Sequence, residues 1–141
     1  MNTDQQGFRH GELTRKIIEV FYQVYNELGY GFLESVYENA MCIALQDAGL
    51  SAECQRSLTV LFRGRSVGEF KTDIIVEKRV LIELKAAKTF DNAHESQTLN
   101  YLKASEIEIG LLMNFGPKPE FKRFVFDNER KASRPFPILP S

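Results

Sequence analysis

Two acidic residues and one lysine form the part of this 141-residue sequence best suited to chemistry. Asp73 lies in the apolar run Phe70–Val76, and Glu83 and Lys85 lie in the next run, Val80–Lys85. Both runs are rich in β-branched residues, which predicts strands. Side chains two residues apart on a strand share a face, so Glu83 and Lys85 are expected to project together.

The position of Asp73 depends on the loop between these two strands. If residues 77–79 form a three-residue loop, Asp73 lies directly opposite Glu83. A two-residue loop would pair Asp73 with Leu84 and turn it to the other face, unless a bulge intervened. Opposed β-carbons lie about 4.5–5.5 Å apart, where two like charges destabilise a sheet. A divalent cation, Mg²⁺ or Mn²⁺, would relieve that repulsion, although the same residues also fit a solvated hairpin face.

Further polar residues lie on the predicted helices. Glu34 lies at the border of an apolar helix face, where a partly desolvated carboxylate needs a cation or a hydrogen-bond donor. Alternatively, Glu34 is an ordinary acidic residue in the first turn of the helix, where the helix dipole favours negative charge. Gln97 and Tyr101 are spaced i and i+4 and share one face of the helix that follows the Glu-x-Lys strand. They are expected near the acids, or else at an ordinary polar helix border.

Hydrophobic periodicity predicts the elements that position these residues. An asparagine N-cap at Asn92, with Glu95 three residues later, gives the third helix a capping-box spacing. We expect an α+β, or mixed α/β, domain in the order α-α-β-β-β-α-β-β over residues 1–130, followed by a Pro-rich, extended surface tail over residues 131–141. The expected helices are Glu12–Leu28, about Phe32–Ala48 and one from Asn92, and the expected strands are Leu58–Phe62, Val67–Val76, Val80–Lys85, Ile107–Phe115 and an edge strand Phe121–Phe126.

Composition restricts the class of protein further. With 43% hydrophobic and 26% charged residues, the chain has the balance of a globular protein rather than a disordered one. It has no apolar run of the 18 or so residues that a transmembrane helix needs, and the first residues lack a signal peptide. Two cysteines, Cys42 and Cys54, are too few for a disulfide scaffold. We therefore expect a cytoplasmic protein with reduced thiols and no membrane association.

Charge is distributed unevenly along the chain. Residues 1–50 carry seven acidic and three basic groups, a net charge of −4, and residues 51–141 carry twelve acidic and fifteen basic groups, a net charge of +3. The C-terminal part can therefore meet a polyanion, although charge alone decides nothing.

The segment Gly31-Phe32-Leu33-Glu34-Ser35-Val36-Tyr37 fits the pattern G-x-x-E-x-x-Y. On that motif the sequence resembles the GxxExxY family of small prokaryotic proteins, which is similar to the PD-(D/E)xK nuclease superfamily. The segment from Gln97 to Tyr101 resembles the Q-x-x-x-Y element of the RecB-like branch, and Glu34 resembles that branch's helical acid. Thr72 stands where many members carry proline, a departure of little expected weight.

The resemblance implies a metal-dependent nuclease that hydrolyses phosphodiester bonds of nucleic acid, DNA in the first instance. Its metal ligands for one or two Mg²⁺ (or Mn²⁺) ions would be Glu34, Asp73, Glu83 and the Leu84 carbonyl. Lys85 would activate water or stabilise charge on phosphorus, and Gln97 would support the site. Tyr37 and Tyr101 would be supporting residues, and weaker phosphate contacts would come from Arg63, Arg65, Lys71 and Lys88, for which solvated surface charge is the alternative.

A second function remains open. The same fold could serve as a non-catalytic module that binds nucleic acid or a protein, with the acids holding a structural ion. The resemblance also leaves open a homodimer and a protein partner that directs the nuclease to its substrate.

Overall fold

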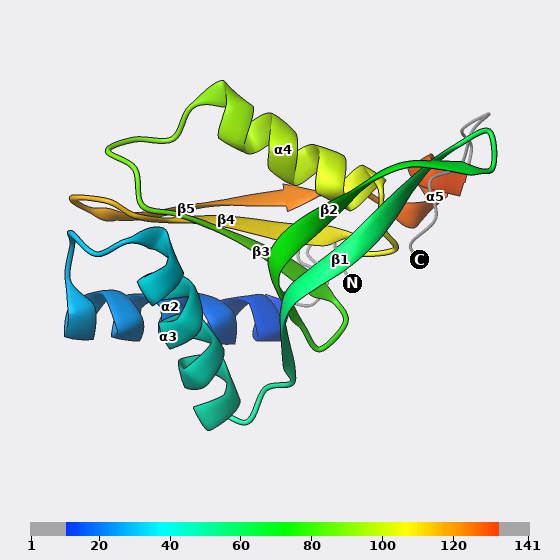
Figure 1. Ribbon diagram of the computed structural model, residues 1–141. Helices are drawn as coiled ribbons and strands as arrows, with labels where there is room; N and C mark the ends of the chain where they lie inside the picture. Colours follow the sequence, from blue (N-terminus) through cyan, green and yellow to red (C-terminus); the bar gives the residue numbers. More distant parts are fainter. Residues whose placement is uncertain (1–10, 133–141) are drawn as a thin grey trace.

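The computed structural model describes residues 11–132, which form a five-stranded sheet with helices on both faces (Figure 1). Helices α2 (Gly11–Leu28) and α3 (Glu34–Asp47) cover one face, and α4 (Asn92–Lys103) covers the other (Figure 1). The predicted α+β class and the order of elements are confirmed. The strands are β1 (Ala52–Phe62), β2 (Arg65–Val76), β3 (Val80–Lys85), β4 (Ile109–Phe115) and β5 (Pro119–Val125), and a short helix α5 (Asn128–Ala132) follows them.

The strand order is β1-β2-β3-β4-β5, so β1 and β5 are the edges of the sheet. Neighbouring strands are antiparallel except β3 and β4, which are parallel. A parallel pair needs a crossover, and α4 supplies it. Because α4 begins soon after β3 ends, its first turns lie beside the C-terminal end of β3.

The core lies mainly between the sheet and the α2–α3 pair. Helix α2 turns one apolar stripe towards the sheet, including Ile17, Phe21 and Val24. Apart from Lys85, every residue of β3 and β4 is buried, as expected of central strands covered on both faces. The two central strands therefore form a rigid base for side chains at their ends.

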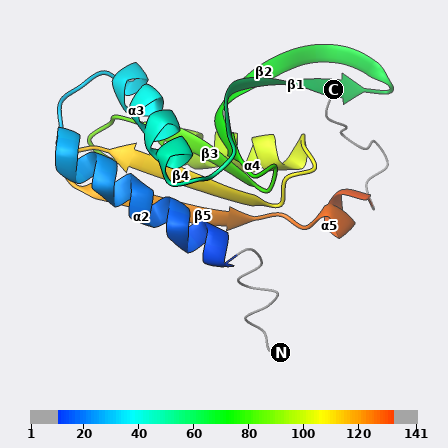
Figure 2. The same ribbon diagram turned by 90° about the horizontal axis from the view of Figure 1, so that it is seen from below.

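The β1–β2 ribbon extends beyond the rest of the sheet. Only Ile74, Ile75 and Val76 of β2 pair with β3, whereas β1 and β2 stay paired to the tip (Figures 1 and 2). The tip is a two-residue turn in which Arg63 and Gly64 both have positive φ, 52° and 77°, as a type I′ hairpin requires. The ribbon thus reaches past the sheet on the side of α4.

Several predicted boundaries were wrong. Strand β1 begins at Ala52 rather than Leu58, because pairing with the long β2 extends it. The N-cap of α4 is Asp91, not Asn92: its carboxylate accepts from the His94 amide at 3.0 Å, and the His94 ring accepts from the Asp91 amide at 3.4 Å. Part of the predicted tail forms α5, and residues 133–141 of it lie outside the described residues.

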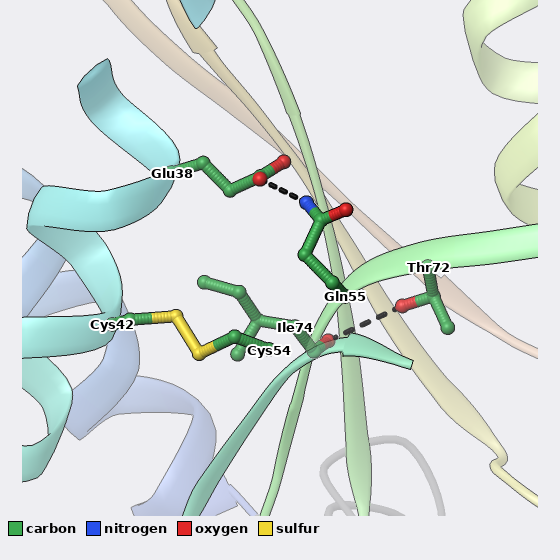
Figure 3. The surroundings of a disulfide bond; sticks show 6 residues. All are labelled: Glu38, Cys42, Cys54, Gln55, Thr72 and Ile74. Atoms are coloured by element: carbon green, nitrogen blue, oxygen red, sulfur yellow. Dashed lines mark hydrogen bonds between the residues drawn. A yellow bond between two sulfur atoms is a disulfide. The ribbon is translucent and has the colours of Figure 1, made fainter. Parts of the chain in front are cut away.

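The expectation of reduced thiols is also wrong for this structure. Cys42 of α3 and Cys54 of β1 form a disulfide (Figure 3). The turn after α3 returns the chain along the helix, which brings the two Cα atoms to 6.6 Å, within the range for a disulfide. This approach depends on how α3 lies against β1, so residue spacing could not show it.

No helix among residues 11–132 is long and apolar enough to span a membrane.

Candidate active site

Asp73 and Glu83 lie opposite each other on β2 and β3. The pairing of Val76 with Val80 gives the three-residue loop, and the backbone ladder continues to Ile74 and Ile82. Beyond Ile74 and Ile82, backbone amides of the two strands donate to carboxylate side chains instead of to carbonyl oxygens of the other strand. The Asp73 amide donates to Glu83 Oε2 at 3.3 Å, and the Leu84 amide donates to Asp73 Oδ2 at 2.7 Å.

Glu83 is the most deeply buried acid of the pair, with 4% of its surface exposed. Burial first, and the Asp73 carboxylate second, raise the pKa of Glu83 to about 9. The hydrogen bond from the Asp73 amide, the positive charge of Lys85 and a hydrogen bond from the Thr72 hydroxyl lower this pKa. A buried acid beside a second acid is costly unless a proton or a cation compensates the charge.

Thr72, which stands where many superfamily members carry proline, contacts Glu83 and was expected to carry little weight. It is fully buried, and its hydroxyl is within hydrogen-bond reach of both the Glu83 carboxylate and the Ile74 carbonyl oxygen, the latter at 3.4 Å (Figure 3). A proline there could not offer this donor. Thr72 therefore stabilises the charged form of Glu83.

The acid of α3 that reaches Asp73 is Glu38, which the sequence analysis did not single out. Partial burial first, then a hydrogen bond with Asp73 and the Asp73 charge, raise the pKa of Glu38 to about 8. Glu34 is exposed one turn earlier and acts on Glu38 through its charge. The i, i+4 spacing of Glu34 and Glu38 was the one signal in the sequence that could have indicated Glu38.

Gln55 of β1 is a second residue that sequence analysis missed. Its neighbours pair as Cys54 with Ile74 and Arg56 with Thr72, so Gln55 falls opposite Asp73. Its side-chain amide donates to Glu38 Oε1 across the gap between α3 and β1 (Figure 3). Gln55 is a polar residue on an edge strand, and the residues around it in the sequence do not indicate that it contacts Glu38.

Lys85, Gln97 and Tyr101 form a hydrogen-bonded chain from β3 to α4, and Gln97 and Tyr101 share one face of α4. Lys85 Nζ donates to Gln97 Oε1 at 3.4 Å, and Gln97 Nε2 donates to the Tyr101 hydroxyl at 2.8 Å. Burial, followed by the charges of Glu83 and Asp73, raises the pKa of Tyr101. Its ring stacks on Phe70 of β2 at 4.1 Å, which fixes the hydroxyl beside the acids.

Tyr37 supports the site indirectly. Its side chain is fully buried and stacks on Phe115 at 4.2 Å, while its hydroxyl donates to the Gly29 carbonyl and accepts from the Phe32 amide at 3.2 Å. These bonds hold the turn that leads into α3. Tyr37 therefore positions the start of the helix that carries Glu38.

Asn114 of β4 fixes the chain after Lys85. It is fully buried, and its amide accepts from the Ala87 amide at 2.9 Å and donates to the Ala87 carbonyl at 2.8 Å. Lys85 pairs with Asn114 across β3 and β4, so this two-point contact holds the segment two residues beyond the lysine.

The four residues predicted to contact phosphates lie in two separate regions of the structure. Lys71 is exposed two residues before Asp73, and Lys88 is exposed three residues after Lys85. Arg63 and Arg65 lie at the tip of the β1–β2 ribbon, eight or more residues along the strands from the acids. Only the two lysines lie close to the acids in sequence.

The acids offer oxygen ligands that suit Mg²⁺ or Mn²⁺. Asp73, Glu83 and Glu38 bring three carboxyl groups together. Glu83 and Glu38 each interact directly with Asp73, and Glu83 is almost fully buried. Within residues 11–132, however, no three acidic, histidine or cysteine side chains converge tightly enough to form a complete ligand set. The donor chemistry fits a divalent cation, and binding one would require side chains to turn towards it.

The chain belongs to the PD-(D/E)XK nuclease superfamily, since that family's model matches residues 11–124. Members of this superfamily are in general nucleases that act on nucleic acid with divalent metals. A search of the curated proteins finds no match. A solved structure titled "Crystal structure of SSO0001" is similar with a TM-score of 0.48 and 18% identity, over 68% of this chain and 52% of that one, so the chain spans about half of that protein.

Proposed function

We propose that this protein is a metal-dependent nuclease that hydrolyses phosphodiester bonds in DNA. The observation that carries the proposal is the direct opposition of Asp73 and Glu83, with Lys85 two residues further along β3 and held by Gln97. Superfamily membership supports the class of reaction. The chain's match to the G-x-x-E-x-x-Y and Q-x-x-x-Y patterns supports the finer assignment to the GxxExxY family and the RecB-like branch.

Each residue has a role that its contacts support. Asp73 and Glu83 would bind Mg²⁺ or Mn²⁺, with Glu38 as a third carboxylate and the Leu84 carbonyl and Glu34 as further candidate ligands. The bound cation would supply Lewis-acid activation of the phosphate and a water of lowered pKa. Lys85 would hold its ammonium group beside the attacked phosphate, where it stabilises developing negative charge. Gln97 would orient Lys85 through their 3.4 Å hydrogen bond, and Tyr101 would hold Gln97.

Substrate binding would use the cations nearest to this centre. Lys71 and Lys88 would contact phosphates next to the cleaved bond, and Arg63 and Arg65 would reach phosphates further away along the ribbon. We place the protein in the cytoplasm, and a homodimer or a protein partner would extend its small binding surface.

The rival function is a non-catalytic binding module. One observation favours it: Asp73 and Glu83 each already accept a backbone amide, at 2.7 and 3.3 Å, and so have partners without a cation. In that case the acids would rigidify the hairpin, and Lys71 and Lys88 would bind nucleic acid without cleaving it.

The test is cleavage of labelled single- and double-stranded DNA and RNA with Mg²⁺, with Mn²⁺ and with EDTA. We expect cleavage of DNA that needs the metal and falls by at least about 10³-fold in Asp73→Asn and in Lys85→Ala. Asp47→Asn, an exposed acid at the end of α3, is the matched control and should cleave like the wild type.

Three outcomes separate the hypotheses. Cleavage that survives both site substitutions would come from a contaminant. Metal-independent binding of nucleic acid without cleavage would favour the module. Cleavage of RNA alone would keep the reaction and correct the substrate.

A further inference from the structure

Two links join α3 to β1 directly beside the acids. The disulfide connects Cys42 to Cys54, and the hydrogen bond connects Glu38 to Gln55 (Figure 3). Cys42 is one helical turn after Glu38, and Cys54 directly precedes Gln55. The Cys42–Cys54 disulfide therefore restrains the distance between Glu38 and Gln55.

Gln55 has a backbone conformation that is unusual for its type. Its φ is 59°, in the left-handed region that residues other than glycine, asparagine and aspartate rarely adopt. The strain falls at the residue opposite Asp73, where β1 directs an amide towards Glu38. Strain of this kind persists only where the surroundings hold it, and it is common at functional sites.

Opening the disulfide would leave α3 in place. Tyr37, Met41 and Leu45 are fully buried against the sheet and α2, so packing holds the helix independently of Cys42. Gln55 has no such support, because it is exposed on an edge strand beside the exposed Cys54. Reduction should therefore loosen the Gln55 side of the pair while the fold remains.

We propose that Gln55 is a positioning residue that holds Glu38 against Asp73, and that the Cys42–Cys54 disulfide makes this positioning depend on redox state. Oxidised protein keeps Glu38 beside Asp73 and binds the divalent cation more tightly than reduced protein does. The metal part of this inference rests on the proposed function, whereas the positioning of Gln55 does not.

The redox step needs a dithiol as reductant. One dithiol sulfur, as thiolate, attacks the sulfur of Cys54, the more exposed residue of the pair, which breaks the S–S bond and releases Cys42 as a thiolate that takes up a proton. The second dithiol sulfur then displaces Cys54, which also leaves as a thiolate and is protonated. The dithiol is oxidised to a disulfide by two electrons, and the protein gains two thiols.

The experiment measures Mn²⁺ affinity by calorimetry in oxidised protein and in protein reduced with dithiothreitol and desalted under nitrogen. We expect reduction to weaken binding about 10-fold, as the loss of a supporting contact does at metal sites. Oxidised Gln55→Met should bind Mn²⁺ more weakly than the oxidised wild type by a similar factor. Reduction should not weaken its Mn²⁺ binding further, because the substitution and the reduction both act through the contact between Gln55 and Glu38. Gln46→Met, an exposed glutamine at the end of α3, should respond like the wild type.

A second readout does not involve the metal. In metal-free protein the Gln55 side-chain amide resonances should move on reduction, and the Cys42→Ser/Cys54→Ser double variant should show the reduced positions in either condition. Unchanged amide resonances, or equal Mn²⁺ affinity in the two redox states, would overturn the inference. So would a full redox response in Gln55→Met, or a reduced protein that unfolds, since the disulfide would then stabilise the whole fold.

Failure of the proposed function has a different signature. If neither redox state binds Mn²⁺ while the Gln55 resonances move as expected, the metal site is refuted and the positioning of Gln55 stands. If Mn²⁺ binds equally in both states, the metal site stands and its redox dependence is refuted.

Discussion

Glu34 and Glu38 lie one turn apart on α3, but their surroundings differ. Glu34 is exposed in the first turn, whereas Glu38 is partly buried and bonded to Asp73 and Gln55. A carboxylate binds a cation well when other oxygen ligands are already close to it. Burial and contacts therefore favour Glu38 over Glu34 as the helical acid of the proposed metal site.

This difference predicts unequal effects of two isosteric substitutions. Glu38→Gln should weaken Mn²⁺ binding about 10- to 100-fold, because it removes a charge next to Asp73. Glu34→Gln should weaken it by less than about threefold, as expected of an exposed charge. Calorimetric titration with Mn²⁺ measures both, and the exposed Glu27→Gln of α2 is the control. A larger loss in Glu34→Gln than in Glu38→Gln would instead return the role to Glu34.

At the scale of elements, the end of β3 is held by its neighbours β4 and α2. Asn114 makes two hydrogen bonds to Ala87, and the Tyr25 hydroxyl of α2 donates to the Gly116 carbonyl at 2.7 Å. Gly116 lies so close to Ala87 that an added Cβ would stand 2.3 Å from the Ala87 carbonyl oxygen. The segment after Lys85 therefore has a single close-packed arrangement.

This packing predicts that Gly116→Ala is destabilising. The clash with backbone cannot be relieved by a side-chain rotation, so the free energy of unfolding should fall by about 1–3 kcal/mol. Gly68→Ala is the matched control: an added Cβ there meets nothing within 4 Å, and the change should stay within about 0.5 kcal/mol. Urea denaturation of the three proteins measures both values, and equal stability of Gly116→Ala and wild type would show that the loop after β3 moves freely.

At the scale of the whole molecule, the buried acid Glu83 links stability to pH. The carboxyl has a pKa of about 9 in the folded protein and 4.5 as its reference value. Between these values the folded state holds one more proton than the unfolded state, so raising the pH favours unfolding. The stability contributed by this group is complete below about pH 4.5 and is lost as the pH rises towards 9.

We therefore expect metal-free protein to lose stability as the pH is raised from 5 to 8, by up to about 1.4 kcal/mol per pH unit. Glu83→Gln should have a flatter profile, because its amide does not titrate. Millimolar Mn²⁺ should restore stability to the wild type at pH 8, since it binds the ionised acids of the folded state alone. Thermal unfolding at several pH values measures these effects; identical profiles for wild type and Glu83→Gln would contradict the assignment.

The sequence by itself determined the elements and the central acids. Side-chain alternation is a local property, so the opposition of Asp73 and Glu83 followed if residues 77–79 form a three-residue loop. The pairing of Val76 with Val80 in the structure chose this loop over the two-residue alternative. The proximity of Gln97 to Lys85 could be expected from the short connection between β3 and α4, whereas the hydrogen bonds from Lys85 through Gln97 to Tyr101 came from the structure. Each of these contacts joins neighbouring elements.

The tertiary structure alone decided which acid of α3 lies beside Asp73 and that Gln55 and the two cysteines meet next to it. Glu38, Gln55 and Asp73 come from three elements, and their contact depends on the angle at which α3 crosses the start of β1 and on the irregular backbone at Gln55. Hydrophobic periodicity indicates which face of a helix is buried, but it does not set that crossing angle or the partner of a polar residue at the edge of the face. Packing between elements sets both.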